Sequence, residues 1–135
     1  MGLTIRLGLP DRPHMTRVLV IEDNPDMREL ERMALEWNGF EVHLASNGED
    51  GLRVFSRAQP SVILLDLMMP VMGGLDFLAA RRDRPDVAGV PVICVSASGQ
   101  TMMEDALRLG ACECLPKPTD FDQLCQRVRE YCAGS

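Results

Sequence analysis

The 135-residue sequence lacks any apolar run close to the roughly 18 residues that a membrane span requires. Its N-terminus also lacks the long apolar core of a secretory signal. The five cysteines are an odd number, which does not suit a framework of disulfides. These absences argue against membrane insertion and favour a cytoplasmic protein in a reducing compartment.

A cysteine-based metal site is also poorly supported. Cys112 and Cys114 are separated by one residue, but no second cysteine pair and no suitably spaced histidine accompanies them. We therefore expect both to be small, buried, apolar residues. The formal net charge of -6 argues against direct binding to nucleic acid, because an acidic surface is repelled by phosphates. Cationic ligands or partners suit this charge better.

The length is that of one domain with a proper core. Residues 1–14 contain two prolines, two glycines and no sustained hydrophobic period, so we interpret them as a flexible leader or tag-like extension. Residues 15–135 are expected to form a single domain.

Five apolar runs of strand length alternate with helical patterns, which is typical of an α/β fold with a doubly wound parallel sheet and helices on both faces. The first, third and fourth runs are apolar throughout and belong in the centre, whereas the second and fifth mix polar with apolar residues and fit the edges. The predicted strand order is 2-1-3-4-5. The strands are expected near Arg17–Glu22, Phe40–Ala45, Ser61–Asp66, Pro91–Val95 and Ala111–Leu115.

Five helices are expected, one after each strand. The first begins at Pro25 after the capping residue Asn24 and ends at Asn38-Gly39, with apolar residues at helical spacing at Met27, Leu30, Ala34 and Trp37. The second and third are expected at Gly48–Ala58 and from Gly74 to just before Pro85, the third turning Leu75, Leu78 and Ala79 toward the sheet. The fourth is expected near Gly99–Leu109, and the last places Phe121, Leu124, Cys125, Val128 and Cys132 on one face.

Three carboxylates follow the two strands that flank the reversal in strand order. Glu22 and Asp23 come directly after the first strand and Asp66 directly after the third. Ligands bind outside the carboxyl ends of parallel strands at this reversal, so the three acids should meet in one crevice. Like charges at such distances call for a divalent cation, and an oxygen-only cluster favours a hard ion such as Mg²⁺.

Two further side chains reach the same edge of the sheet. Ser96 follows the fourth strand and Lys117 follows the fifth. A hydroxyl and an ammonium group can both bind phosphoryl oxygens. A metal site, a lysine and a hydroxyl around one carboxylate nucleophile are sufficient parts for phosphoryl transfer.

From Arg17 to about Cys132 the chain resembles a receiver domain of the bacterial response-regulator family. Four motifs at successive strand ends carry the resemblance: the acidic pair Glu22-Asp23, the pattern D-x-x-M-P-x-M-x-G from Asp66 to Gly74, Ser96-Ala97, and Lys117-Pro118. The implied function is a phosphoacceptor switch of a two-component or phosphorelay system. It would catalyse only its own phosphorylation and slow dephosphorylation, and is not expected to be an enzyme in the usual sense.

The resemblance also implies roles for individual residues. Asp66 would accept the phosphoryl group from a phosphohistidine of a sensor kinase or phosphotransfer protein. Mg²⁺, for which Mn²⁺ could substitute, would be held by Asp23, Asp66 and the main-chain carbonyl of Met68, and by Glu22 through a water. Lys117 and Ser96 would bind the phosphoryl oxygens, and the Lys117-Pro118 peptide would be cis.

In the family, the response to phosphorylation centres on the fourth helix, fifth strand and fifth helix. This surface would contact a downstream effector protein or domain, or a second copy of the chain in a homodimer. The sequence departs from the commonest pattern at three positions: Glu22 replaces Asp, Ser96 replaces Thr, and Cys114 stands where the family usually has Tyr or Phe. The usual aromatic switch is therefore absent.

Three other functions would each leave a different mark in the sequence. An aspartyl phosphatase would commonly need a second acid two residues after the nucleophile, where this chain has Met68. A flavin or nucleotide carrier would need a Gly/Ser/Thr-rich loop after the first strand, where this chain has Glu-Asp-Asn-Pro-Asp. A receiver-like module that binds partners without phosphorylation would be indicated by missing acids or lysine.

Overall fold

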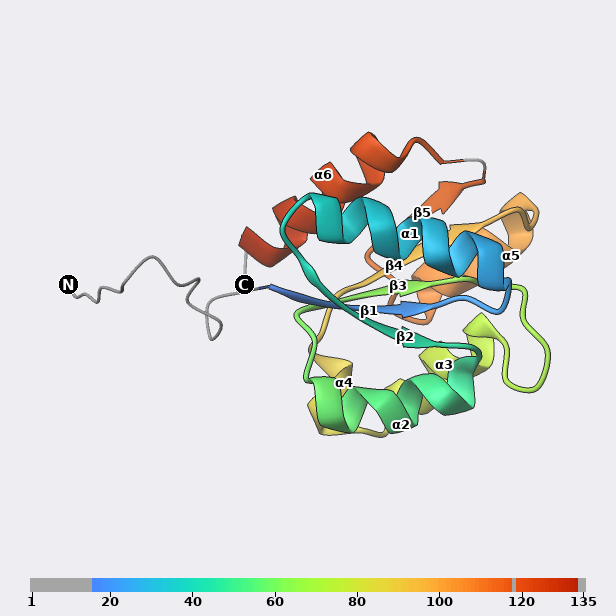
Figure 1. The fold of residues 1–135 in the computed structure, drawn as a ribbon. Helices are drawn as coiled ribbons and strands as arrows, with labels where there is room; N and C mark the ends of the chain where they lie inside the picture. The colour runs from blue at the N-terminus through green and yellow to red at the C-terminus, as the bar shows by residue number, and fades with distance from the viewer. Residues whose placement is uncertain (1–15, 118, 134–135) are drawn as a thin grey trace.

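The apolar runs form the strands of one parallel sheet in the computed structural model, which describes residues 16–117 and 119–133. The order is β2-β1-β3-β4-β5, as predicted, with helices on both faces (Figure 1). The strands are β1 Arg17–Ile21, β2 Glu41–Ala45, β3 Val62–Leu65, β4 Val92–Ser96 and β5 Glu113–Pro116. The predicted leader at residues 1–14 and the peptide bond to Pro118 lie outside the described residues.

Alternate residues of the central strands supply two separate cores. One core joins Ile21, Leu65 and their neighbours to helices α2 (Gly48–Ala58), α3 (Gly74–Arg81) and α5 (Gln100–Arg108). The other joins Val20, Leu64 and their neighbours to helices α1 (Pro25–Trp37) and α6 (Phe121–Ala133). The central strands are therefore covered on both faces, which explains why they are apolar except at Arg17, where β1 begins, and Ser96, where β4 ends.

Helix α1 begins where predicted, because the Asn24 side chain accepts a hydrogen bond from the Met27 N–H at 2.9 Å. The apolar residues whose spacing predicted the helix are not its buried ones, however. Trp37 is 90% exposed and Leu30 is 47% exposed, whereas the buried residues are Glu31 and Leu35. The apolar spacing predicted the helix but not the face that packs on the sheet.

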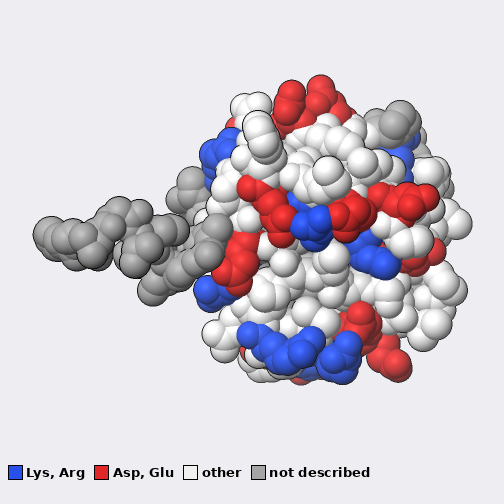
Figure 2. All heavy atoms as spheres, viewed as in Figure 1, with Lys and Arg blue, Asp and Glu red and all other residues white. Residues whose placement is uncertain are grey.

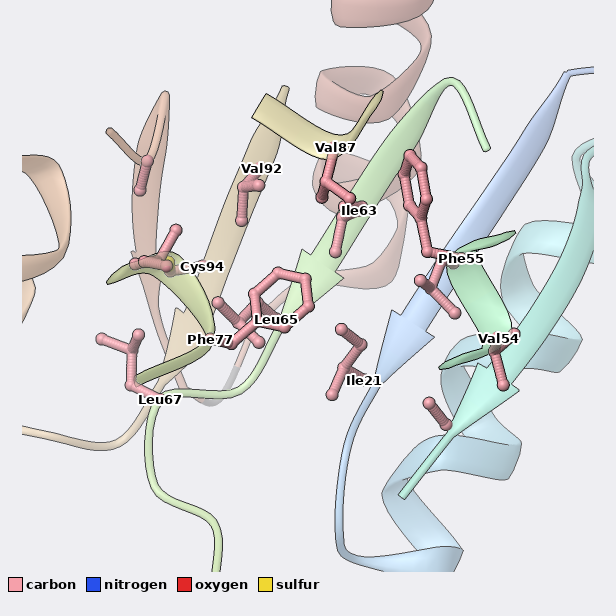
Figure 3. Packing of buried hydrophobic residues seen from close by; sticks show 14 of the residues in the cluster. Ile21, Val54, Phe55, Ile63, Leu65, Leu67, Phe77, Val87, Val92 and Cys94 are labelled. Carbon is pink, nitrogen blue, oxygen red and sulfur yellow. The ribbon is translucent and has the colours of Figure 1, made fainter. Parts of the chain in front are cut away.

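The stretch predicted as the third helix is two helices. Arg84 is extended before Pro85, and the proline opens a new four-residue helix, α4, at Pro85–Ala88. The chain thus has six helices within its described residues. In α3, Leu78 is buried as predicted, but Ala79 is exposed and Phe77 is fully buried. Phe77 packs between the sheet and the neighbouring helices (Figure 3).

The prediction that Cys112 and Cys114 are both buried was wrong for Cys112 and only partly right for Cys114. Cys112 is exposed, and Cys114 is half-buried with its thiol directed to the Met103 carbonyl at 3.5 Å.

No helix in residues 16–117 and 119–133 is long and apolar enough to cross a membrane. On the surface, acidic and basic side chains alternate along α1, where Arg32 pairs with Glu29 and Glu36 (Figure 2).

Candidate functional site

The ends of β1 and β3 bring the three predicted carboxylates together. The Asp66 N–H donates to the Ile21 carbonyl at 3.0 Å, which continues the ladder between the two strands to their ends. Each of the three acids, Glu22, Asp23 and Asp66, contributes one carboxylate oxygen, and these three oxygens lie within 4.8 Å of one another. Glu22 and Asp66 are buried and Asp23 is half-buried. An oxygen-only set of this size fits a hard divalent cation such as Mg²⁺.

The Asp66 carboxyl lies in an environment that favours its protonated form. Burial, followed by the negative charge of Glu22, raises the pKa of its carboxyl from 3.8 to about 7, even though Lys117 and the Met68 N–H act in the opposite direction. That N–H donates to Asp66 Oδ1 at 3.2 Å, so Met68 lies directly beside the carboxylate. A cation entering the cluster would offset the repulsion from Glu22 and favour the ionised form of Asp66.

Lys117 reaches into this cluster from the end of β5. Its Nζ lies 2.9 Å from Glu22 Oε1 and 3.6 Å from Asp66 Oδ2. Burial alone would lower the pKa of Lys117, but the neighbouring carboxylates outweigh burial and raise it above its usual value. The ammonium group is therefore charged near neutral pH and lies where it can meet an anion bound to Asp66.

Ser96 is at the predicted strand end and is buried, but its hydroxyl is already engaged. Ser96 Oγ donates to Ser98 Oγ at 2.8 Å and accepts from the Ser98 N–H at 3.0 Å. Its main-chain carbonyl accepts from the Lys117 N–H at 2.9 Å, which ties the β4 and β5 ends together. Ser98 was not predicted from the sequence as part of the site. The hydrogen bonds between Ser96 and Ser98 must rearrange before the Ser96 hydroxyl can donate to an incoming phosphoryl oxygen.

Gly74 lets helix α3 begin tightly against the loop that holds Asp66. A Cβ on Gly74 would lie 2.6 Å from Leu67 Cα and 2.7 Å from the Asp66 carbonyl oxygen. Only glycine allows this approach of two backbone segments, and the Gly74 N–H uses it to donate to the Leu67 carbonyl at 3.0 Å. The last glycine of the Asp66–Gly74 motif therefore fixes the loop.

A fourth acid, Glu31 of α1, lies near the cluster and was missed from the sequence. It is 3% exposed, and burial together with the charge of Glu22 raises its pKa from 4.5 to about 8. A signal was available, because Glu31 is four residues before the core residue Leu35 and therefore shares its face of the helix. The apolar residues Leu30 and Trp37 are centred on an adjacent, exposed side of the helix.

The surface that the family resemblance associates with the response is formed here by α5, β5 and α6, because the short α4 shifts the helix numbering. Cys114, at the position where an aromatic residue was expected from the resemblance, lies in β5 and its thiol contacts a carbonyl of α5. The Cys114 thiol connects β5 to α5. Its side chain is too small to make the inward movement that the resemblance associates with an aromatic residue at this position.

Comparison with known proteins agrees with this geometry. A model of the response regulator receiver domain matches residues 18–129. The regulatory protein AtoC of Escherichia coli is 34% identical over 110 residues, which cover 82% of this chain and 24% of AtoC. A CpxR homolog of Haemophilus influenzae is 34% identical over 116 residues, which cover 85% of this chain and 49% of that protein. The chain thus spans half or less of these two relatives.

Solved structures give the same result. The receiver domain of the Francisella response regulator 1452 superimposes with a TM-score of 0.81 at 28% identity, covering 88% of this chain and 98% of that one. The chemotaxis protein CheY4 of Vibrio cholerae gives a TM-score of 0.81 at 26% identity, covering 87% and 98%. Family match, fold and acidic site all agree: the chain belongs to the response regulator receiver domain family.

Proposed function

We propose that Asp66 accepts a phosphoryl group from a phosphohistidine of a sensor kinase or phosphotransfer protein, in a reaction that depends on Mg²⁺. Receiver domains are phosphoacceptor switches, and they bind Mg²⁺ at an acidic pocket. The observation that carries the residue assignment is the convergence on Asp66 of two further acids and one ammonium group.

The transfer exchanges one bond for another. An oxygen of the Asp66 carboxylate attacks phosphorus, the P–N bond of the phosphohistidine breaks, and the electron pair remains on the imidazole nitrogen of the donor. The Lys117 ammonium group neutralises charge on the phosphoryl oxygens. Its Nζ already lies 3.6 Å from Asp66 Oδ2, so only a short movement is needed. Ser96 contributes its hydroxyl once the hydrogen bond to Ser98 is released.

The residues proposed to hold Mg²⁺ are Asp23, Asp66 and the Met68 carbonyl, with Glu22 acting through a water. When bound, the ion supplies neutralisation of negative charge on the phosphoryl oxygens. The pairing of Glu22 with Lys117 at 2.9 Å supports an indirect role for Glu22, because its carboxylate is already committed to a cation. Mn²⁺ shares the preference for oxygen ligands and would substitute.

We propose that α5, β5 and α6 form the surface that changes on phosphorylation. Phosphorylation would alter this surface and with it the contact to an effector protein or domain, or to a second copy of the chain. The net charge of -6 argues against direct nucleic-acid binding by this domain. We also propose a cytoplasmic site of action, on the basis of the cysteine content.

Intact-mass spectrometry after incubation with Mg²⁺ and acetyl phosphate tests the acceptor assignment. We expect the mass of one added phosphoryl group on the wild type and on Asp76→Asn, an exposed acid of α3 that serves as the matched control. We expect no addition to Asp66→Asn or in the presence of EDTA. An adduct that persists in Asp66→Asn, or no adduct on the wild type, would refute the proposal.

A further inference from the structure

Glu31 occupies an unusual place for a carboxyl group. Helical side chains tilt toward the N-terminus of their helix, and the N-terminus of α1 follows directly after Glu22 and Asp23. The Glu31 side chain is accordingly directed toward the acidic site. It lines a cavity of about 160 Å³ whose other walls include Lys117 and the apolar residues Met27, Val95 and Phe121.

The charges around Glu31 come from the proposed phosphoryl site itself. Negative charge on Glu22, at the end of β1, and on Asp66, at the end of β3, disfavours its ionised form, and Lys117 at the end of β5 favours it. The effect is mutual, because Glu31 also favours the charged form of Lys117. In this structure the Lys117 ammonium lies with Glu22 and Asp66, and Lys117 and Glu31 line the same cavity.

Lysine carries its charge on a flexible four-carbon stem, so its ammonium group can exchange between partners that lie on either side of it. The cavity leaves room for that movement. We propose that Glu31 is a positioning residue for Lys117, offering its ammonium group a second resting place away from Asp66. The inference rests on the proposed function, in which Lys117 binds the phosphoryl oxygens.

A competition for Lys117 has a measurable consequence. Whenever the ammonium group lies with Glu31, Asp66 lacks the cation that would meet an incoming phosphoryl group. Replacing Glu31 by an uncharged residue of the same shape should therefore raise the rate constant for phosphorylation. We expect an increase of about twofold to fivefold, the range that a modest ion-pair interaction supports.

The kinetic test compares Glu31→Gln with Glu29→Gln, using acetyl phosphate, Mg²⁺ and intact mass. Glu29 is an exposed acid of the same helix, so its variant changes the net charge equally without facing the site. The assay is run at about pH 9, where Glu31 is ionised because its pKa is about 8. We expect acceleration in Glu31→Gln and none in Glu29→Gln. In a Lys117→Met background the Glu31 effect should disappear.

A second readout does not depend on phosphorylation. Lys117 is the only lysine in the sequence, so protein labelled with carbon-13 lysine gives one set of lysine side-chain signals in NMR. We expect Glu31→Gln to shift the Lys117 Cε signal and to lower the pKa of Lys117, while Glu29→Gln leaves both unchanged. Glu31→Met, which removes the charge but fills similar space, serves if Glu31→Gln folds poorly.

The outcomes separate this inference from the function on which it rests. An unchanged lysine signal and unchanged rate in Glu31→Gln, with normal phosphorylation of Asp66, would overturn only the positioning role. Equal acceleration with and without Lys117 would show that Glu31 acts by repelling the donor, which also overturns it. If the wild type takes up no phosphoryl group, the proposed function fails and so does the effect of Glu31 on it; the lysine signal then reports only whether the two side chains interact.

Discussion

Asp66→Asn should stabilise the protein in the absence of metal. The folded state raises the pKa of Asp66 from 3.8 to about 7, so between these values the folded protein binds a proton that the unfolded chain has released. Stability from this group is therefore lost as the pH rises through that window. The pKa rises by about 3, and each pKa unit corresponds to about 1.4 kcal/mol. The loss of unfolding free energy caused by ionising Asp66 is therefore at most about 4 kcal/mol.

Asparagine avoids this loss because it carries no charge. Its amide oxygen can still accept the hydrogen bond from the Met68 N–H that Asp66 Oδ1 accepts now at 3.2 Å. We expect Asp66→Asn to gain about 2–4 kcal/mol of unfolding free energy at pH 8 and almost none below about pH 4. Glu22 and Lys117 readjust around the new amide, which keeps the gain below the upper limit.

Urea denaturation followed by circular dichroism at several pH values, with EDTA present, measures the effect. Asp76→Asn is the control for loss of one negative charge on the surface, and we expect its unfolding free energy to follow the wild type at every pH. Saturating Mg²⁺ should stabilise the wild type more than Asp66→Asn and so narrow the gap. The reasoning would be refuted by a gap that is absent at pH 8 or that does not grow with pH.

Four other substitutions test the site, the loop that supports it and the packing of α3. Lys117→Met should slow phosphorylation by acetyl phosphate at least about tenfold and cost about 1–3 kcal/mol, because a buried carboxylate loses its ammonium partner; mass kinetics and urea melts check both. Gly74→Ala should lower the unfolding free energy by about 1–3 kcal/mol, since its Cβ would meet Leu67 Cα at 2.6 Å; equal stability in urea would contradict this. Phe77→Ala should cost about 3–5 kcal/mol and Ala79→Ser less than about 0.5 kcal/mol, as thermal melts would show.

The strand order was predictable because burial on both faces leaves a direct mark on composition. Every residue of Val62–Leu65 is buried, and no polar residue interrupts the run. The acidic cluster was predictable for a related reason, since strand ends in a parallel sheet fall at one edge. Residues such as Asp66 could therefore be placed together before any contact was known.

Helix faces were harder to predict, because side-chain polarity is a poor guide where a charged group is buried for a reason. Glu31 looks like a surface residue of α1, and Trp37 looks like a core residue, yet each is in the opposite environment. Arg81 is similar: it is buried in α3 and donates to the carbonyls of Ala88 at 2.9 Å and Val90 at 2.7 Å, contacts that hold the α4 segment. Such contacts depend on tertiary structure and leave no periodic signal.

The exposed position of Trp37 decides which optical experiments will work. It is the only tryptophan in the chain and lies at the last residue of α1, about 18 Å of helix away from the end that adjoins Glu22 and Asp23. Its indole is already in water, so its emission should change little when the protein unfolds or when an ion enters the acidic cluster. The same ring is well placed to report a partner that covers the outer side of α1, for which no label would be required.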